Sequence, residues 1–193
     1  MNEHQRFLVG VLAGMCFLAT TNLAAQRAQT REGFWIGFGV GQGNLRWECN
    51  GCSTQDHGGP TGFIRLGGTP SQKVLLGAEI NGWSLDIGAA EITALTTTFS
   101  IYWYPSATGG LFLKGGLGGG VYERKTASTD AQSTGGAVQF GGGYDLRVGQ
   151  KISITPMLTL WASGKADLKD GSTTLNTGFR HSGGTIQVGI TFH

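Results

Sequence analysis

The chain has 193 residues, enough for one domain preceded by an export signal. Only 13% of the residues are charged and the net charge is +2, which excludes the concentrated basic charge that nucleic-acid binding requires. Glycine is abundant, with 35 residues, but there is no G-X-Y repeat and there are only 4 prolines, so a collagen helix is excluded. Because the glycines stand inside alternating apolar segments, we interpret them as part of a tightly packed sheet.

The first 25 residues are typical of a secretory signal. A polar head containing Arg6 precedes twelve apolar residues from Phe7 to Leu18, and a small and polar stretch follows to Ala25. In a helix these twelve residues span about 18 Å, less than the roughly 30 Å core of a bilayer. We therefore expect 1–25 to be a removed signal peptide, 26–32 a short lead and 33–193 the mature domain. No later segment has the roughly 18 apolar residues of a membrane-spanning helix.

The end of the chain shows a period of two most clearly. Four apolar residues alternate with small or polar ones, namely Ile186, Val188, Ile190 and Phe192. Such alternation predicts a strand with one apolar face. An apolar alternation that ends in an aromatic residue suits a closing strand whose outer face meets lipid.

Seven earlier segments alternate in the same way. With the last segment, 183–193, the expected strands are 33–47, 60–67, 73–85, 92–104, 111–123, 136–147 and 152–163. A tilted strand needs about 9–11 residues to cross a bilayer, and these segments have similar lengths. The sequence therefore predicts an all-β fold, a single antiparallel eight-stranded transmembrane up-and-down β-barrel, preceded by a cleaved signal peptide.

The connections between these segments differ in length. Those at 68–72, 105–110 and 148–151 are short; those at 48–59, 124–135 and 164–182 are long, and 86–91 is the exception. Short turns on one side and long loops on the other are typical of outer-membrane barrels whose termini face the periplasm.

The face opposite the apolar one is rich in Gly, Ser and Thr and carries four isolated charges, Arg65, Glu79, Lys114 and Asp145. Such a face is poor in charge for a water-exposed surface but suits the interior of a narrow barrel. An unpaired interior charge is costly, so we expect a polar network in which Glu79 pairs with Arg65 or Lys114. A narrow conduit lined by these charges is the alternative.

Aromatic residues support the same arrangement. Four of them fall at the periplasmic ends of strands on the apolar face and predict one aromatic girdle: Phe34, Trp103, Tyr144 and Phe192. The alternation places Trp83 and Trp161 on the inward face instead.

The chain resembles the small eight-stranded outer-membrane barrels of the OmpA-transmembrane-domain, OmpX and opacity-protein type. The resemblance covers 33–193 and is carried by three segments, 33–41 (GFWIGFGVG), 153–159 (SITPMLT) and 188–192 (VGITF). It implies a monomer in the cell outer membrane, surrounded by outer-membrane lipid and lipopolysaccharide and inserted by the barrel-assembly machinery.

Cys49 and Cys52 are the cysteines that remain after removal of the signal peptide. In an oxidising compartment such a pair indicates a disulfide. A metal site with Asp56 and His57, or a redox function, is the alternative. A catalytic C-x-x-C normally opens a helix, whereas this one lies in an Asn-Gly loop.

The remaining candidates lie near the last expected loop. His181 and Ser182, with Asp167 or Asp170 as the orienting acid, suggest a hydrolase that modifies lipid A, but the two are adjacent where the deacylases are expected to have His-x-Ser. Basic residues of the expected loops are candidates for contact with anionic headgroups or a partner: Lys125, Lys165, Lys169 and Arg180. We expect a non-enzymatic barrel with a structural or surface-interaction role, without cofactor or metal. A narrow channel, a lipid A-modifying enzyme and a soluble lipocalin-like binder are the alternatives.

Overall fold

The computed structural model describes residues 31–193, which form strands and their connections. The expected signal peptide, 1–25, and nearly all of the lead, 26–32, lie outside the described residues. Within 31–193, no helix is long and apolar enough to cross a membrane. The strand segments are β1 (Gly33–Glu48), β2 (Gln55–Ser71), β3 (Val74–Ile87), β4 (Ala90–Trp103), β5 (Leu111–Lys125), β6 (Asp130–Tyr144), β7 (Leu146–Arg147), β8 (Ile152–Ser163), β9 (Ala166–Asp170) and β10 (Thr173–Phe192).

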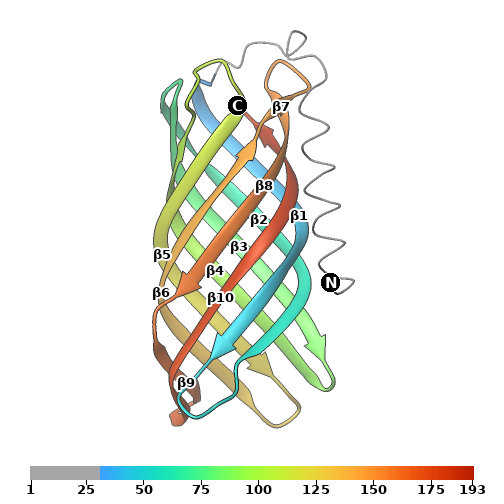
Figure 1. The fold of residues 1–193 in the computed structure, drawn as a ribbon, viewed down its shortest axis with the longest axis vertical. Helices are drawn as coiled ribbons and strands as arrows, with labels where there is room; N and C mark the ends of the chain where they lie inside the picture. The colour runs from blue at the N-terminus through green and yellow to red at the C-terminus, as the bar shows by residue number, and fades with distance from the viewer. Residues whose placement is uncertain (1–30) are drawn as a thin grey trace, which may run out of the picture.

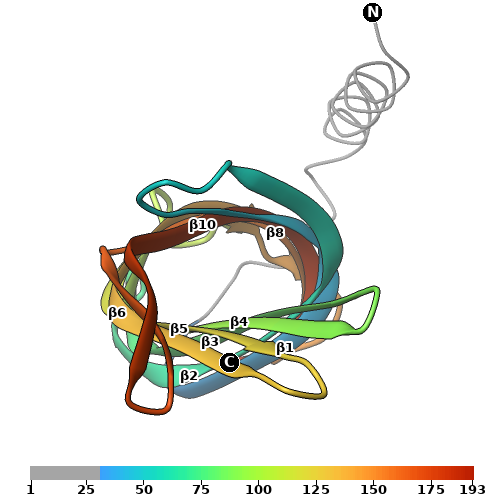
Figure 2. The same ribbon diagram turned by 90° about the horizontal axis from the view of Figure 1, so that it is seen from below.

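The strands form a closed antiparallel barrel (Figures 1 and 2). Sequence neighbours pair from β1 to β6, and β10 pairs with β1 along Ile36↔Phe192 to Glu48↔Arg180, so the sheet has no free edge there. β6 and β7 together form one wall strand and β8 and β9 the next, because both members of one pair lie against the other pair. The predicted eight-stranded up-and-down barrel is therefore confirmed.

A proline explains the interruption between β6 and β7. The register is the same on both sides of it, Gly143↔Met157 before and Leu146↔Ile154 after. Pro156 lies opposite the gap, and proline has no N–H to donate to a ladder. Pro156 is still part of the barrel wall, because on its other side it pairs with Val188 of β10.

The barrel has two different ends. We call the end with Gly33 and Phe192 the terminus end, at the top of Figure 1, and the opposite end the far end. At the terminus end the outer face is apolar, and the structure places Phe34, Trp103 and Phe192 there as exposed side chains, with Tyr144 half-buried. This apolar outer surface continues along all the wall strands as the band that meets lipid.

The strands continue beyond the apolar band, which corrects the expected loops. β2 begins at Gln55 and β6 at Asp130, and 164–182 contains β9 and half of β10, so the far-end connections shrink to 49–54, 88–89, 126–129 and 171–172. The terminus-end connection 104–110 is as long as any of these, so the predicted sorting of short and long loops was wrong. What distinguishes the far end is a barrel extension with a polar outer face.

The apolar alternation inverts where this extension begins, without any change in strand phase. On β1, Phe38 and Val40 face outward, but Leu45, further along, faces inward and is fully buried. On β4, Phe99 and Leu95 face outward, and Ile92 faces inward. These strands are thus apolar toward lipid along the band and apolar toward the lumen in the extension beyond it, as burial in two different surroundings requires.

Glycines on the inner face of the strands leave no room for a side chain of their own. A Cβ at Gly41 would collide with the Ile186 carbonyl oxygen, and one at Gly118 would collide with the Thr97 carbonyl oxygen. A Cβ at the outward-facing Gly62 would have its nearest neighbour 3.6 Å away. The glycines of the inner face therefore provide the space for its larger side chains, as their place in the alternation suggested.

Candidate functional site

Aromatic side chains fill the lumen at the terminus end. The cluster consists of Trp35, Phe63, Leu75, Tyr102, Tyr104, Phe112 and Met157, all buried. Among them lies Arg65 from β2, whose guanidinium carbon is 5.1–5.7 Å from the centroids of four of these rings. Arg65 also donates a hydrogen bond to Thr191 Oγ1 at 2.8 Å. Cation–π attraction strengthens when the charge is desolvated, which suits this buried position.

Arg31, which the sequence pattern did not indicate, closes this end. Its guanidinium carbon lies 3.5 Å from the centroid of the Tyr104 ring. It donates hydrogen bonds to the carbonyl oxygens of Gln72, Ala107 and Gly109 in two terminus-end turns. No alternation reaches this residue, so only the three-dimensional structure reveals its role.

The predicted interior charges are all buried, and Glu79 is the centre of their network. Its carboxylate accepts hydrogen bonds from Lys114 Nζ, Asn81 Nδ2 and the Tyr102 hydroxyl, which come from three wall strands. Of the two expected partners of Glu79, Lys114 is thus the one in contact. Gln139 extends the network by donating to Thr98 Oγ1 at 2.6 Å and Ser100 Oγ at 2.8 Å. Buried charges require such partners, because desolvation of an unpaired carboxylate is costly.

Asp145, the fourth predicted charge, forms a separate group nearer the terminus end. It is the residue between β6 and β7. Its carboxylate accepts hydrogen bonds from the Tyr104 hydroxyl and Thr155 Oγ1, each at 2.7 Å. His193 Nε2 lies 3.5 Å from Asp145 Oδ2. Asp145 therefore stabilises the wall at the site where Pro156 breaks the ladder.

A second apolar cluster, which we call the far-end cluster, fills the lumen of the extension. Its buried members are Leu45, Trp83, Ile92, Ala94, Tyr122, Ala131, Trp161, Leu168 and Phe179. Trp83 and Trp161 are thus inward, as the alternation placed them. Trp47, Cys49, Leu85 and Ile87 are only partly buried and pack against the cluster from the mouth.

His181 lies on β10, not in a loop, and its ring packs against Tyr122, Trp161 and Phe179 of this cluster. Its Nδ1 lies 2.9 Å from Ser163 Oγ, which also accepts the His181 backbone N–H at 2.9 Å. Ser182, the partner considered from sequence, faces the other way because successive residues of a strand alternate in direction. Asp167 is exposed on the outer surface, so it is not an orienting acid for His181. The nucleophile, base and acid of a hydrolase are therefore not brought together at this place.

Polar contacts hold the rim of the far end. Cys49 and Cys52 form a disulfide with their Cα atoms 5.3 Å apart, as predicted. Neither His57 nor Asp56 turns toward it: His57 stacks on Trp47 with ring centroids 5.1 Å apart, and Asp56 lies 3.7 Å from Arg46.

Two further exposed ion pairs lie on the same rim. Arg180 Nε is 2.9 Å from Glu48 Oε1, and Lys125 Nζ is 3.1 Å from Glu123 Oε2. The hydrogen bond from Arg180 lowers the pKa of Glu48, and the one to Glu123 raises the pKa of Lys125. Lys165 and Lys169 are exposed to solvent.

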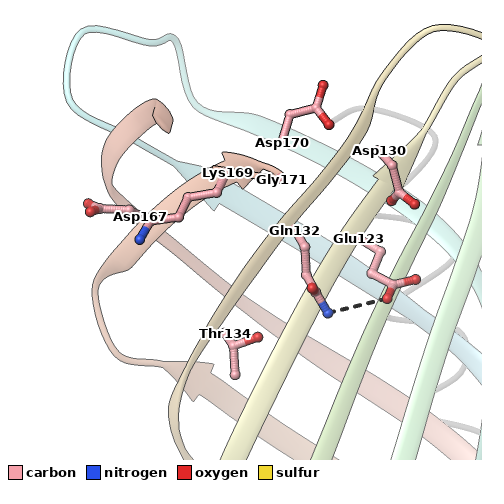
Figure 3. Close-up of a pocket in the computed structure, with 8 residues that line it drawn as sticks. All are labelled: Glu123, Asp130, Gln132, Thr134, Asp167, Lys169, Asp170 and Gly171. Carbon is pink, nitrogen blue, oxygen red and sulfur yellow. Dashed lines mark hydrogen bonds between the residues drawn. The ribbon is translucent and has the colours of Figure 1, made fainter. Parts of the chain in front are cut away.

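A hollow of about 680 Å³ indents the outer wall of the extension (Figure 3). Its lining comes from β5, β6, β9 and the turn after β9, and consists of Glu123, Asp130, Gln132, Thr134, Asp167, Lys169, Asp170 and Gly171. The hollow lies beside a stretch of β6 that has no ladder partner on this side. The pairing of β6 with β8 ends at Ala137↔Ser163, and its pairing with β9 begins at Gln132↔Lys169. Carboxylates outnumber cations in this lining, so the hollow is electronegative.

Comparison with known proteins identifies the fold. No protein-family model matches the chain, and no curated protein matches it by sequence. Among solved structures, Neisserial surface protein A superposes with a TM-score of 0.60 at 10% identity, covering 85% of this chain and 99% of that protein. Ail, the attachment invasion locus protein of Yersinia pestis, superposes with a TM-score of 0.53 at 11% identity, covering 83% and 99%. The chain thus has the fold of the small eight-stranded outer-membrane barrels, and its apolar band places it in the outer membrane.

Proposed function

We propose that this outer-membrane barrel is not an enzyme and acts through the surface of its far-end extension, in a structural or surface-interaction role. The observation that carries the proposal is the filled lumen. The terminus-end aromatic cluster, the Glu79 network and the far-end cluster follow one another along the barrel axis and occupy it with buried side chains. An eight-stranded barrel has room for side chains and little more.

The surroundings of the extension support this assignment. With the termini on the periplasmic side, the far end projects from the cell, and its outer face carries the charged rim and the hollow. Neisserial surface protein A and Ail are described as a surface protein and an attachment invasion locus protein, and the proposed role is of the same class.

The alternatives have less support. A channel needs a continuous polar path, whereas the far-end cluster is apolar across the lumen. A lipid A-modifying enzyme needs an accessible nucleophile with a base and an acid, whereas the His181 and Ser163 pair is enclosed by aromatic rings of the far-end cluster.

Three measurements test the proposal. The purified protein in planar bilayers should conduct no more than an empty bilayer, and its overproduction should leave the mass of lipid A unchanged. Cells that display the barrel should attach or aggregate more than cells without it, and external protease that trims the far end should abolish the difference. Stepwise conductance, altered lipid A, or identical behaviour of producing and non-producing cells would contradict the proposal.

A further inference from the structure

Residues 49–54, which join β1 to β2, form a compact turn at the far end. The Cys49–Cys52 disulfide closes it, and the Cys52 N–H donates to the Cys49 carbonyl oxygen at 3.3 Å. Gly51 has a φ of +80°, a left-handed conformation that glycine adopts without strain. The disulfide therefore fixes the shape of this turn.

The turn is docked on β10, the strand on the other side of β1. The Asn50 N–H donates to the Thr177 carbonyl oxygen at 3.1 Å, and Asn50 Nδ2 lies 3.4 Å from Thr177 Oγ1. Asn176 Nδ2 lies 3.7 Å from Cys52 Sγ. The pairing of β10 with β9 shifts register on both sides of Asn176, so this part of β10 has few ladder partners. Contacts from the turn thus take the place of part of the missing ladder.

The same turn contacts the lumen through its first residue. Cys49 is half-buried and packs against the far-end cluster, as Trp47, Leu85 and Ile87 of the neighbouring strands do. Cys52, by contrast, is exposed to solvent. A thiol in solution can therefore reach one sulfur of the bond, while the other is held against the mouth of the lumen.

We propose that residues 49–54 are a redox-sensitive lid over the far-end cluster, opened by a low-molecular-weight thiol. The thiolate attacks Cys52 Sγ, the disulfide bond breaks, and Cys49 leaves as a thiolate that takes up a proton. A second thiolate attacks the sulfur of the first thiol in this mixed disulfide, and Cys52 leaves as a thiolate that takes up a proton, so two small thiols become one disulfide as the protein gains two thiols. Without the crosslink the turn loses its fixed shape, Asn50 separates from Thr177, and the apolar mouth meets solvent.

Amide hydrogen exchange in lipid nanodiscs, read by mass spectrometry, tests the lid. Treatment of the oxidised protein with dithiothreitol should raise exchange roughly tenfold both at 49–54 and at 174–181. Amides of the band at 36–40 and 186–190 should not change. The C49S/C52S double variant should exchange like the reduced protein with or without dithiothreitol.

A matched variant separates docking from the crosslink. Asn50→Ala keeps the disulfide and removes the side-chain contact with Thr177, so it should raise exchange at 174–181 by less than reduction does. An increase confined to 50–53 on reduction would overturn the proposal, because the disulfide would then stabilise only its own turn. A disulfide that resists dithiothreitol in the folded protein would overturn it as well.

Discussion

The buried Glu79–Lys114 pair allows the sharpest test of the lumen. Lys114→Met removes the cation and keeps a side chain of similar length. The Glu79 carboxylate is then left with Asn81 and Tyr102 as donors in a place where its exposure is zero. Glu79→Gln removes the anion instead and leaves the Lys114 ammonium buried without its partner.

Each single substitution should be costly and the double substitution should not. Removing one member of a buried ion pair costs about 3–5 kcal/mol, because the other charge remains desolvated. Two of the three donors to Glu79 remain in Lys114→Met, so we expect the lower end, ~3 kcal/mol. The double variant leaves no uncompensated charge, and its cost should fall below that of the two single variants together by at least ~2 kcal/mol.

Urea unfolding of the protein in lipid vesicles, followed by tryptophan fluorescence, gives the free energies for this cycle. Gel mobility before and after boiling shows whether each variant still forms a closed barrel. Costs that add to within ~0.5 kcal/mol would refute the reasoning, because independent costs mean that the two charges do not stabilise one another in the lumen.

Three further predictions concern the wall and the rim. Gly41→Ala should cost ~1–3 kcal/mol through overpacking, whereas Gly62→Ala should stay within ~0.5 kcal/mol; equal costs in urea unfolding would contradict the assigned inner and outer faces. Phe99→Arg, on the lipid-facing side of β4, should cost ~2–4 kcal/mol of unfolding free energy. Thr93→Arg, on the same side of that strand beyond the band, should cost ~0–1 kcal/mol. The reverse order of costs would contradict the position assigned to the lipid-facing band. The ion pair of Glu48 with β10 depresses the folded-state pKa of this carboxyl below its ordinary 4.5, so its stabilisation is present above that pH and is lost as the pH falls through the folded value. An NMR titration of Glu48 should give a midpoint below 4.5, and an unshifted midpoint would exclude the pair.

The sequence indicated the parts of the barrel where one environment acts on a whole segment. Along the lipid band every second residue is apolar, so the strands, their inward charges and the inward tryptophans follow from periodicity alone. The interior position of Glu79 is a consequence of parity, since it lies on the face opposite Ala78 and Ile80. Which cation it meets depends on the stagger of the strands, and that is a property of the closed barrel.

The parts that sequence reasoning missed join residues from different strands or have no period. Ser163 and His181 lie in neighbouring wall strands, and His181 falls within 164–182, the segment that was expected to be a polar loop. Arg31 precedes the first alternating segment and reaches its partners only after the barrel has closed. In both cases the contact is tertiary, and no local pattern of residue types represents it.

Loops were expected at the far end because the apolar side chains move from the outer to the inner face of the strands where the extension begins. Followed back along β6, the outward-facing apolar residues Phe140 and Val138 give way to Thr134 and Gln132 in the same alternation, and 124–135 was therefore expected to be a loop. The strand begins at Asp130, however, and Ala131 is buried on the other face. The residue at which the apolar face changes sides is therefore where the outer surroundings change from lipid to water. On β10 the change falls between Phe179 and Ile186, and Ile186 pairs with Gln42 of β1. The two neighbouring strands thus invert at about the same level, as they should if one membrane surface imposes the change on both.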